Sequence, residues 1–242
     1  MELEVIEDSE VFEIEIGKKS STLKVEDFTQ SQSHGLFWDN EIREKVFGLP
    51  SCKNDTKKYD ISCSENKFDP SENISIKTSS NNNIDCGDIL RFFNGDFTNK
   101  YTIILIRYSQ LEDKKIIKEI IELNYTIELR NYLFGSISEE ILTNYVKVIK
   151  SIPYGNVSND IKTTYKKLKN NLQASHNMKI NISPKVDSRS QRRVQCSIPK
   201  VDKLIEQFPE ILISRTTSSI VRGVAITSTI NSGARKRNKK EC

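Results

Sequence analysis

Apolar and polar residues alternate over a short stretch that follows a polar, turn-rich segment. In 73–77 two isoleucines alternate with Ser75 and Lys77, the pattern of a strand with one buried face. A second short strand is expected at 59–61, before the turn-rich segment. If the two strands pair antiparallel, Asp60 comes near Ser75 and Lys77, because facing side chains of neighbouring strands lie within reach of one another. The pattern predicts a hairpin that gathers an acid, a hydroxyl and a lysine.

The spacing of apolar residues predicts further elements. A helix is expected to begin at Ser33 and to end at Gly48 and Pro50. The apolar run 101–108 is typical of a buried central strand. The other predicted elements are a helix over 84–93, a helix or strand over 116–123, a strand over 125–129, a helix from a capping box at Ser136 to Lys150, a helix over 159–172, strands at 179–182 and 194–198, and a helix over 199–208. Together they predict an α/β (α+β) fold, with a central mixed β-sheet flanked by helices.

Charge is distributed unevenly along the 242 residues, although the net charge is only +4. From Lys150 onward there are 19 Lys and Arg against 6 Asp and Glu, whereas the preceding part has 18 against 27. An acidic part that binds cations and a basic part that binds a polyanion indicate a metal-dependent enzyme acting on nucleic acid. We expect the chain to divide near residue 150, into an acidic part over 1–150 and a basic nucleic-acid-binding region over 151–242 that packs on the same core. An ordinary solvated surface with a basic tail is the alternative interpretation.

Composition excludes several other classes. No apolar run approaches the roughly 18 residues of a membrane span, and the acidic N-terminus is unlike a signal peptide, so no membrane partner is expected. The five cysteines are an odd number without CxxC spacing, which argues against a zinc cluster or a disulfide framework. A reducing, cytoplasmic location is therefore expected. The two histidines lie far apart in sequence, so chemistry that needs a histidine pair is not expected.

Three further acids are candidates for a site near Asp60. Glu41 lies on the first predicted helix, near the border of its apolar face, where the ordinary interpretation is a solvated flanking residue. Asp85 and Asp88 are three residues apart near the start of the predicted helix 84–93 and share a face of it. Capping alone would explain one of them.

The order of helix acid, strand aspartate and strand lysine resembles the PD-(D/E)xK nuclease superfamily, which includes most type II restriction endonucleases. The matching positions are Glu41, Asp60, Ser75 and Lys77, and the resemblance covers 33–108. The fold that it implies is a restriction-endonuclease-like core, with a metal-dependent nuclease core over 1–150 and a basic C-terminal DNA-recognition region over 151–242.

The sequence departs from the superfamily pattern at Tyr59, where proline is common, and at Ser75, where a second carboxylate is expected. Some members with serine there take the missing acid from the next helix, which assigns that role to Asp88, with Glu41 as the other donor. The resemblance implies that Asp60, the relocated acid and the Ile76 carbonyl bind magnesium (Mg²⁺). Lys77 would then orient the attacking water or the phosphate.

The expected activity is that of a sequence-specific double-stranded DNA endonuclease, working as a homodimer. A structure-selective or repair nuclease of the same superfamily and a non-catalytic DNA-binding protein are the alternatives. Loop 188–193 is predicted to be the tip of a β-ribbon that reads the major groove, and lysines of helix 159–172 are predicted to contact phosphates. The residues expected to contact DNA are Thr78, Ser79, Lys162, Lys166, Lys167, Arg189, Gln191, Arg192 and Arg193.

Overall fold

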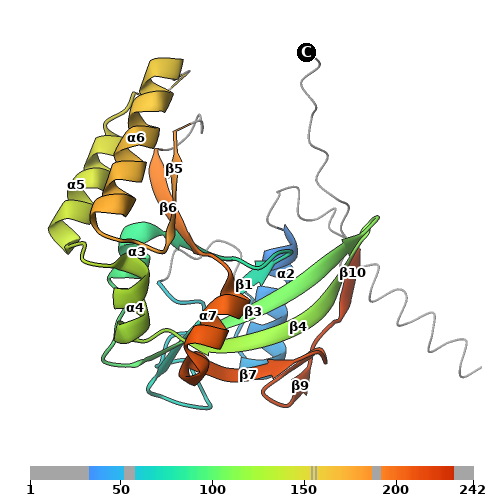
Figure 1. Ribbon diagram of the computed structural model, residues 1–242. Helices are drawn as coiled ribbons and strands as arrows, with labels where there is room; N and C mark the ends of the chain where they lie inside the picture. The colour runs from blue at the N-terminus through green and yellow to red at the C-terminus, as the bar shows by residue number, and fades with distance from the viewer. Residues whose placement is uncertain (1–32, 52–57, 154, 156, 187–191, 232–242) are drawn as a thin grey trace, which may run out of the picture.

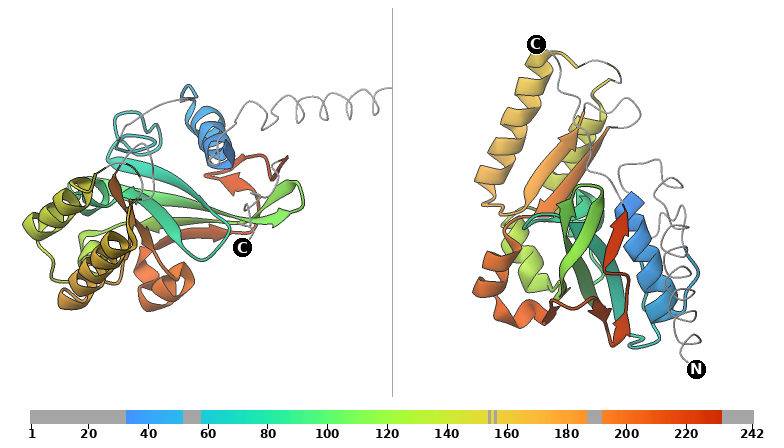
Figure 2. Two further views of the ribbon diagram at one scale, coloured as in Figure 1. Left: turned by 90° about the horizontal axis from the view of Figure 1, so that it is seen from above. Right: turned by 90° about the vertical axis from the view of Figure 1, so that its right-hand side faces the viewer.

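A curled, mixed five-stranded sheet forms the centre of the fold, and helices flank it (Figure 1). A three-stranded antiparallel sheet stands beyond one end of it, together with two long helices (Figures 1 and 2). The fold is therefore mixed α+β, as predicted. The structure is a computed structural model, which describes residues 33–51, 58–153, 155, 157–186 and 192–231.

The helices and strands follow one another in an order that mixes the two kinds throughout. In chain order they are α2 (Ser33–Glu41), the π-helix η2 (Ile42–Phe47), β1 (Glu72–Ser79), β2 (Ile84–Asp88), α3 (Ile89–Phe93), β3 (Lys100–Leu111), β4 (Lys114–Asn124), α4 (Ile127–Phe134), α5 (Glu139–Lys150), α6 (Asn159–Ser175), β5 (Asn181–Lys185), β6 (Arg193–Ile198), α7 (Val201–Gln207), the 3-10 helix η3 (Pro209–Ile211), β7 (Leu212–Thr216), β8 (Ile220–Val221), β9 (Val224–Ala225) and β10 (Thr229–Asn231).

Strand pairing joins the two halves of the sequence in one sheet. Strand β1 lies parallel to β3, and β3 and β4 form a long antiparallel hairpin. Strands β7 and β10, from the end of the chain, both pair antiparallel with β4. The predicted division at residue 150 therefore does not separate the central sheet, because strands from both sides of it take part.

The central sheet is buried on both faces. The predicted buried strand 101–108 is confirmed as the middle of β3, and its residues point alternately to two hydrophobic clusters. Ile104 packs in the cluster with Trp38 and Ile42, so α2 and η2 cover one face. Ile103 and Leu105 belong to the other cluster, which helices α3, α4, α5 and α7 share. Burial on both faces explains why β3 is a continuous apolar run.

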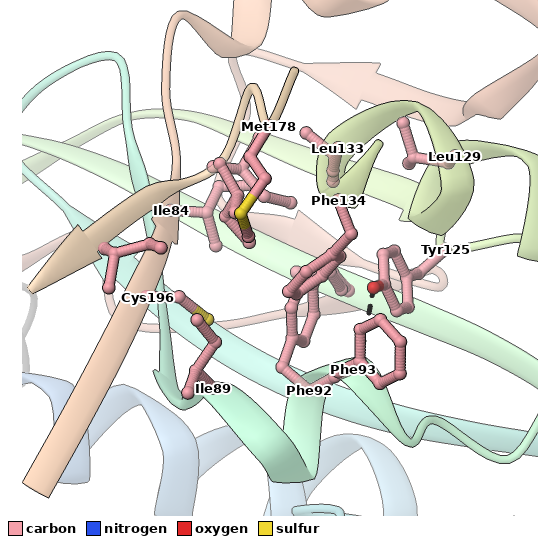
Figure 3. Close-up of a cluster of buried hydrophobic side chains, with 14 of the residues drawn as sticks. Ile84, Ile89, Phe92, Phe93, Tyr125, Leu129, Leu133, Phe134, Met178 and Cys196 are labelled. Atoms are coloured by element: carbon pink, nitrogen blue, oxygen red, sulfur yellow. Dashed lines mark hydrogen bonds between the residues drawn. The ribbon is translucent and has the colours of Figure 1, made fainter. Parts of the chain in front are cut away.

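Aromatic rings fill the larger cluster where α3 meets α4 (Figure 3). Phe92 stacks on Tyr125 with 4.2 Å between ring centroids, and Phe93 meets Phe134 edge to face at 5.0 Å. The same cluster includes Met178 and residues of β2 and β6, so it continues into the three-stranded sheet. One contiguous core thus fixes the position of that sheet relative to the central one.

Two element predictions before residue 130 are wrong. Residues 84–88 form strand β2, and the helix begins only at Ile89. A bulge in the pairing of β2 with β6 and the positive φ of Gly87 (73°) account for the switch from strand to helix. Segment 125–129 is the start of helix α4, because the Thr126 hydroxyl accepts a hydrogen bond from the Leu129 amide as its N-cap.

The remaining predicted elements are present with shifted bounds, except that residues 59–61 form only an isolated bridge to Ile74. The strand expected at 179–182 is β5, and strands β7 to β10 were not predicted. Segment 116–123, left open between helix and strand, is a strand. Helix α5 is capped by Ser138, whose hydroxyl accepts from the Ile141 amide, so the capping box expected at Ser136 is not used. Helix α7 begins at Val201 rather than at residue 199. In the part of the chain that the structure describes, no helix is long and apolar enough to cross a membrane.

Candidate active site

The predicted hairpin brings Asp60 to β1 through a single pair of backbone hydrogen bonds. Ile61 donates to the Ile74 carbonyl at 3.1 Å and accepts from the Ile74 amide at 2.8 Å, an isolated antiparallel bridge rather than a full strand at 59–61. The register places the Asp60 carboxylate beside the end of β1. Its Oδ2 accepts the Ile76 amide at 2.6 Å and lies 3.2 Å from Lys77 Nζ.

The Lys77 ammonium occupies the space between two oxygens that were predicted as metal ligands. Its Nζ lies 3.2 Å from Asp60 Oδ2 and 3.1 Å from the Ile76 carbonyl oxygen. Desolvation acts to lower the pKa of Lys77, but the charge and hydrogen bond of Asp60 and the charge of Asp39 outweigh it and raise that pKa. Lys77 is therefore a cation held by two acids, with 27% of its side chain exposed.

Asp39, on α2, is the second acid of the site, and it was not predicted. Its Oδ1 is buried and has no hydrogen-bond partner among the described residues. Burial raises its pKa to about 7, and the negative charge of Asp60 raises it too, while Lys77 and Arg43 act to lower it. A buried carboxyl group without a partner for one oxygen is costly, so it marks a place where a ligand would be stabilising.

Arg43 connects the helix to the hairpin. It is buried, and its guanidinium donates to the backbone carbonyl of Asp60 and, at 3.3 Å, to that of Pro50. Asp39 and Arg43 are four residues apart in the helical segment, so both face the hairpin. This spacing of acid and arginine was the available sequence signal for Asp39.

Glu41 was predicted as the helix acid, and the structure places it elsewhere. Its carboxylate accepts hydrogen bonds from the Thr227 amide at 2.9 Å and the Thr227 hydroxyl at 2.5 Å, and it pairs with Lys45. These contacts attach the segment before β10 to the helix. The assignment of Glu41 as a metal donor is therefore corrected, because its oxygens are committed to Thr227 on a different side of the helix from Asp39.

The acids predicted to replace the carboxylate missing at Ser75 accept hydrogen bonds from backbone amides close to them in sequence. Asp88 caps helix α3, and its Oδ1 accepts the Arg91 amide at 3.0 Å. Asp85 is exposed and accepts the Gly87 amide at 3.0 Å. Because β2 is a strand up to Asp88, these acids do not share a helix face as expected, and the metal role of Asp88 stays a prediction. Ser75 itself is buried, and its hydroxyl lies 3.1 Å from the Tyr101 hydroxyl.

Among the described residues, no group of three or more His, Cys, Asp or Glu side chains could hold a metal ion. The oxygens gathered here are two carboxylates, those of Asp39 and Asp60, and the Ile76 carbonyl. Mg²⁺ commonly keeps several waters and takes one or two carboxylates plus substrate phosphate oxygens. The donor set, with the unpaired Asp39 Oδ1, therefore fits one Mg²⁺ that substrate would help to bind.

The residues predicted to contact DNA divide into separate groups. Thr78 and Ser79 line a polar hollow of about 280 Å³ that opens beside the end of β1. Lys166 and Lys167 are exposed on α6, and Lys162 is half-buried there. Helix α6 lies on the opposite side of β5 and β6 from β1 and α2, so its lysines are not brought to the site (Figures 1 and 2).

The predicted reading loop is described only at its C-terminal end, and Arg189 and Gln191 lie outside the described residues. Arg192 is buried, and its guanidinium donates to the carbonyls of Val186, Pro153 and Gly155. It ties the β5–β6 hairpin to the α5–α6 connection, so its assignment as a base-reading residue is corrected. Arg193 is exposed at the start of β6.

Comparison of this chain with protein-family models, with curated proteins and with solved structures gives no match. The chemistry of the site is therefore inferred from its own geometry. Asp39, Asp60 and Lys77 come from a helix, a bridge and a strand, and they place two acids and one cation within electrostatic reach of one another.

Proposed function

We propose that the chain is a Mg²⁺-dependent endonuclease that hydrolyses phosphodiester bonds of double-stranded DNA, with Asp39, Asp60 and Lys77 as its catalytic residues. The observation that carries the proposal is the position of Lys77 Nζ, 3.2 Å from Asp60 Oδ2 and 3.1 Å from the Ile76 carbonyl, beside the unpaired Asp39 Oδ1. A cation already stands among the oxygens where a divalent ion would be bound.

Each residue has a role that follows from its surroundings. Asp39, Asp60 and the Ile76 carbonyl would hold the ion, which when bound stabilises charge on the phosphate and lowers the pKa of a coordinated water. Lys77 then no longer needs to neutralise both acids, and its ammonium is available to a phosphate oxygen or to the attacking water. Its flexible stem allows this change of partner without moving β1.

The site also supports membership of the PD-(D/E)xK superfamily, with one change of residue. Asp39 takes the place of the helix acid that Glu41 was expected to fill, and it supplies the carboxylate that Ser75 lacks. A helix acid, a hairpin aspartate and a strand lysine are the residues that a restriction-endonuclease-like active site would need. Two such sites would cut both strands in one binding event, which is the reason to propose a homodimer acting on duplex DNA.

Cleavage of supercoiled plasmid in MgCl₂, with EDTA as the blank, tests the proposal. We expect Asp60→Ala and Lys77→Ala to reduce the rate by about 10²-fold or more, as loss of a catalytic acid–base or phosphate-orienting group does. Asp113→Ala, in the β3–β4 turn, and Lys114→Ala, at the start of β4, change exposed residues and are matched controls that should cut at the wild-type rate.

The products distinguish the candidate functions. Discrete bands with a common end sequence support a restriction-type enzyme, and nicks confined to branched substrates support a structure-selective or repair nuclease. Binding of duplex without any metal-dependent cleavage would leave a non-catalytic DNA-binding protein and refute the proposed function. Cleavage by Asp60→Ala at the wild-type rate would show that the active site lies elsewhere.

A further inference from the structure

One face of the β5–β6 hairpin is polar along its whole length. The side chains of β6 alternate, with Val194 and Cys196 buried, and Gln195 and Ser197 at least partly exposed. Helix α5 packs against β6 and the apolar residues belong to the large core cluster, so the polar residues lie on the face away from the core. The pairing register places Ser183 opposite Gln195, and Lys185 opposite Arg193.

This polar face lines a hollow that extends to the two residues directly after Lys77 on β1. Its volume is about 280 Å³, and it is lined from one side by Thr78 and Ser79, which directly follow Lys77 on β1. Its other lining residues include Asp85, Ser183, Lys185, Gln195 and Ser197. A ligand that fills the hollow therefore reaches from the sheet face to the residues next to the catalytic lysine.

We propose that this face of β5–β6, with Gln195 at its centre, contacts the edges of the bases beside the phosphate that is cut, and that Lys185 and Arg193 hold the adjacent backbone. The proposal rests on the proposed function and deepens it, because it assigns sequence recognition to the sheet face rather than to the loop tip or to helix α6.

The chemistry of the face fits duplex DNA. Glutamine can bind adenine through two hydrogen bonds, serine hydroxyls can donate to or accept from several base edges, and Asp85 could accept from the amino group of cytosine. Lys185 and Arg193, paired at the far end of the hairpin, supply positive charge for phosphates.

A selection from a pool of randomised duplexes tests this role for Gln195. Wild type and variants are incubated with the pool in CaCl₂ to select bound duplexes, and separately in MgCl₂ to sequence the cut ends. We expect Gln195→Ala to lower the preference for the favoured base at one position by about 5- to 150-fold, the range of one bidentate contact. Gln195→Glu should shift the preferred base instead. Asn231→Ala, an exposed amide on β10, is the matched control.

Lys185→Ala should weaken all duplexes alike and reduce the slope of log affinity against log salt by about 0.9, the share of one phosphate contact. Lys203→Ala on α7 is its control and should leave the slope unchanged. Thermal unfolding of each variant establishes that the fold is retained.

The result separates this inference from the proposed function. A wild-type chain that selects a motif but never cuts would refute the nuclease, and loss of that motif in Gln195→Ala would still support the reading face. A wild-type chain that cuts plasmid, with the same end sequences in Gln195→Ala and Gln195→Glu, would refute the reading face alone. A wild-type chain that selects no duplex would also refute it.

Discussion

Replacement of Asp39 by asparagine removes a carboxyl group whose proton the folded chain holds unusually tightly. Burial and the nearby charge of Asp60 raise its pKa from an ordinary value of 3.8 to about 7. The folded state therefore binds a proton at pH values where the unfolded chain has already released it. Asparagine has nearly the same shape and cannot titrate, so the comparison isolates that proton.

The direction of the pH dependence of the unfolding free energy follows from proton binding in the folded and unfolded states. Below the unfolded pKa both states carry the proton, and the stabilisation from the raised pKa is fully present; it is lost as pH rises through the folded value near 7. The difference between 3.8 and about 7 corresponds to at most roughly 4 kcal/mol at 1.36 kcal/mol per unit. Relative to wild type, Asp39→Asn should therefore gain up to that amount between pH 4 and pH 8.

Urea unfolding at several pH values in EDTA measures this difference. Titrating groups that do not interact with Asp39 cancel in the difference of the two unfolding free energies, whereas Asp60 and Lys77, which interact with its charge, contribute to that difference. Asp113→Asn, in the exposed β3–β4 turn, is the control and should give a flat difference. A flat difference for Asp39→Asn would refute the argument that its carboxyl group is buried without compensation.

At pH 8, Mg²⁺ should reverse the order of stability of wild type and Asp39→Asn. MgCl₂ at pH 8 should stabilise wild type by mass action, because the ion binds the folded site, and it should stabilise Asp39→Asn much less. This readout needs no catalysis. Equal stabilisation of both proteins by MgCl₂ would remove Asp39 from the proposed ion site, even if its raised pKa were verified.

The other predictions concern residues that the structure assigns to stability. Glu41→Gln should lower the unfolding free energy by about 1–3 kcal/mol through its weakened bonds with Thr227, while plasmid cleavage by the folded protein stays at the wild-type rate. Arg192→Met should cost more than about 2 kcal/mol in urea unfolding, because buried carbonyls lose their donor, but should leave the base preference of selected duplexes unchanged. Asp88→Asn keeps a good N-cap for α3, so stability should change by less than about 0.5 kcal/mol and cleavage should be retained; a tenfold loss would return the metal role to Asp88.

The Asp60–Lys77 contact was predictable because it depends on a local pattern. Alternation along β1 fixes which side chains share a face, and a short turn-rich connection leaves few ways for Asp60 to approach. The identity of the helix acid was not predictable in the same way. Asp39 and Glu41 contact different parts of the chain. Glu41 accepts hydrogen bonds from Thr227, a residue 186 positions away. The change from α2 to the π-helix η2 also alters the angular spacing assumed for a regular helix.

The helix predicted over 84–93 failed for a related reason. Apolar residues at 84, 89, 92 and 93 fit helical spacing, but Ile84 belongs to a strand whose partner, β6, lies more than a hundred residues later. A β partner so distant in sequence cannot be inferred from periodicity. The local signal that was overlooked is Gly87, since a glycine with positive φ favours a bulge over a helix interior.

The residues expected to read bases were chosen by side-chain type, although the alternation pattern already separated buried from exposed positions. Val194, Cys196 and Ile198 are apolar at every second position, so Arg192 must share their buried face, while Arg193, Gln195 and Ser197 share the other. The N–H groups of a buried arginine need hydrogen-bond acceptors, and those of Arg192 donate to the carbonyls of Val186 and Pro153. The polar face lines the hollow that reaches Thr78 and Ser79, the two residues directly after Lys77. Recognition and cleavage would then be coupled through one short segment, Lys77 to Ser79, without any movement of the hairpin tip.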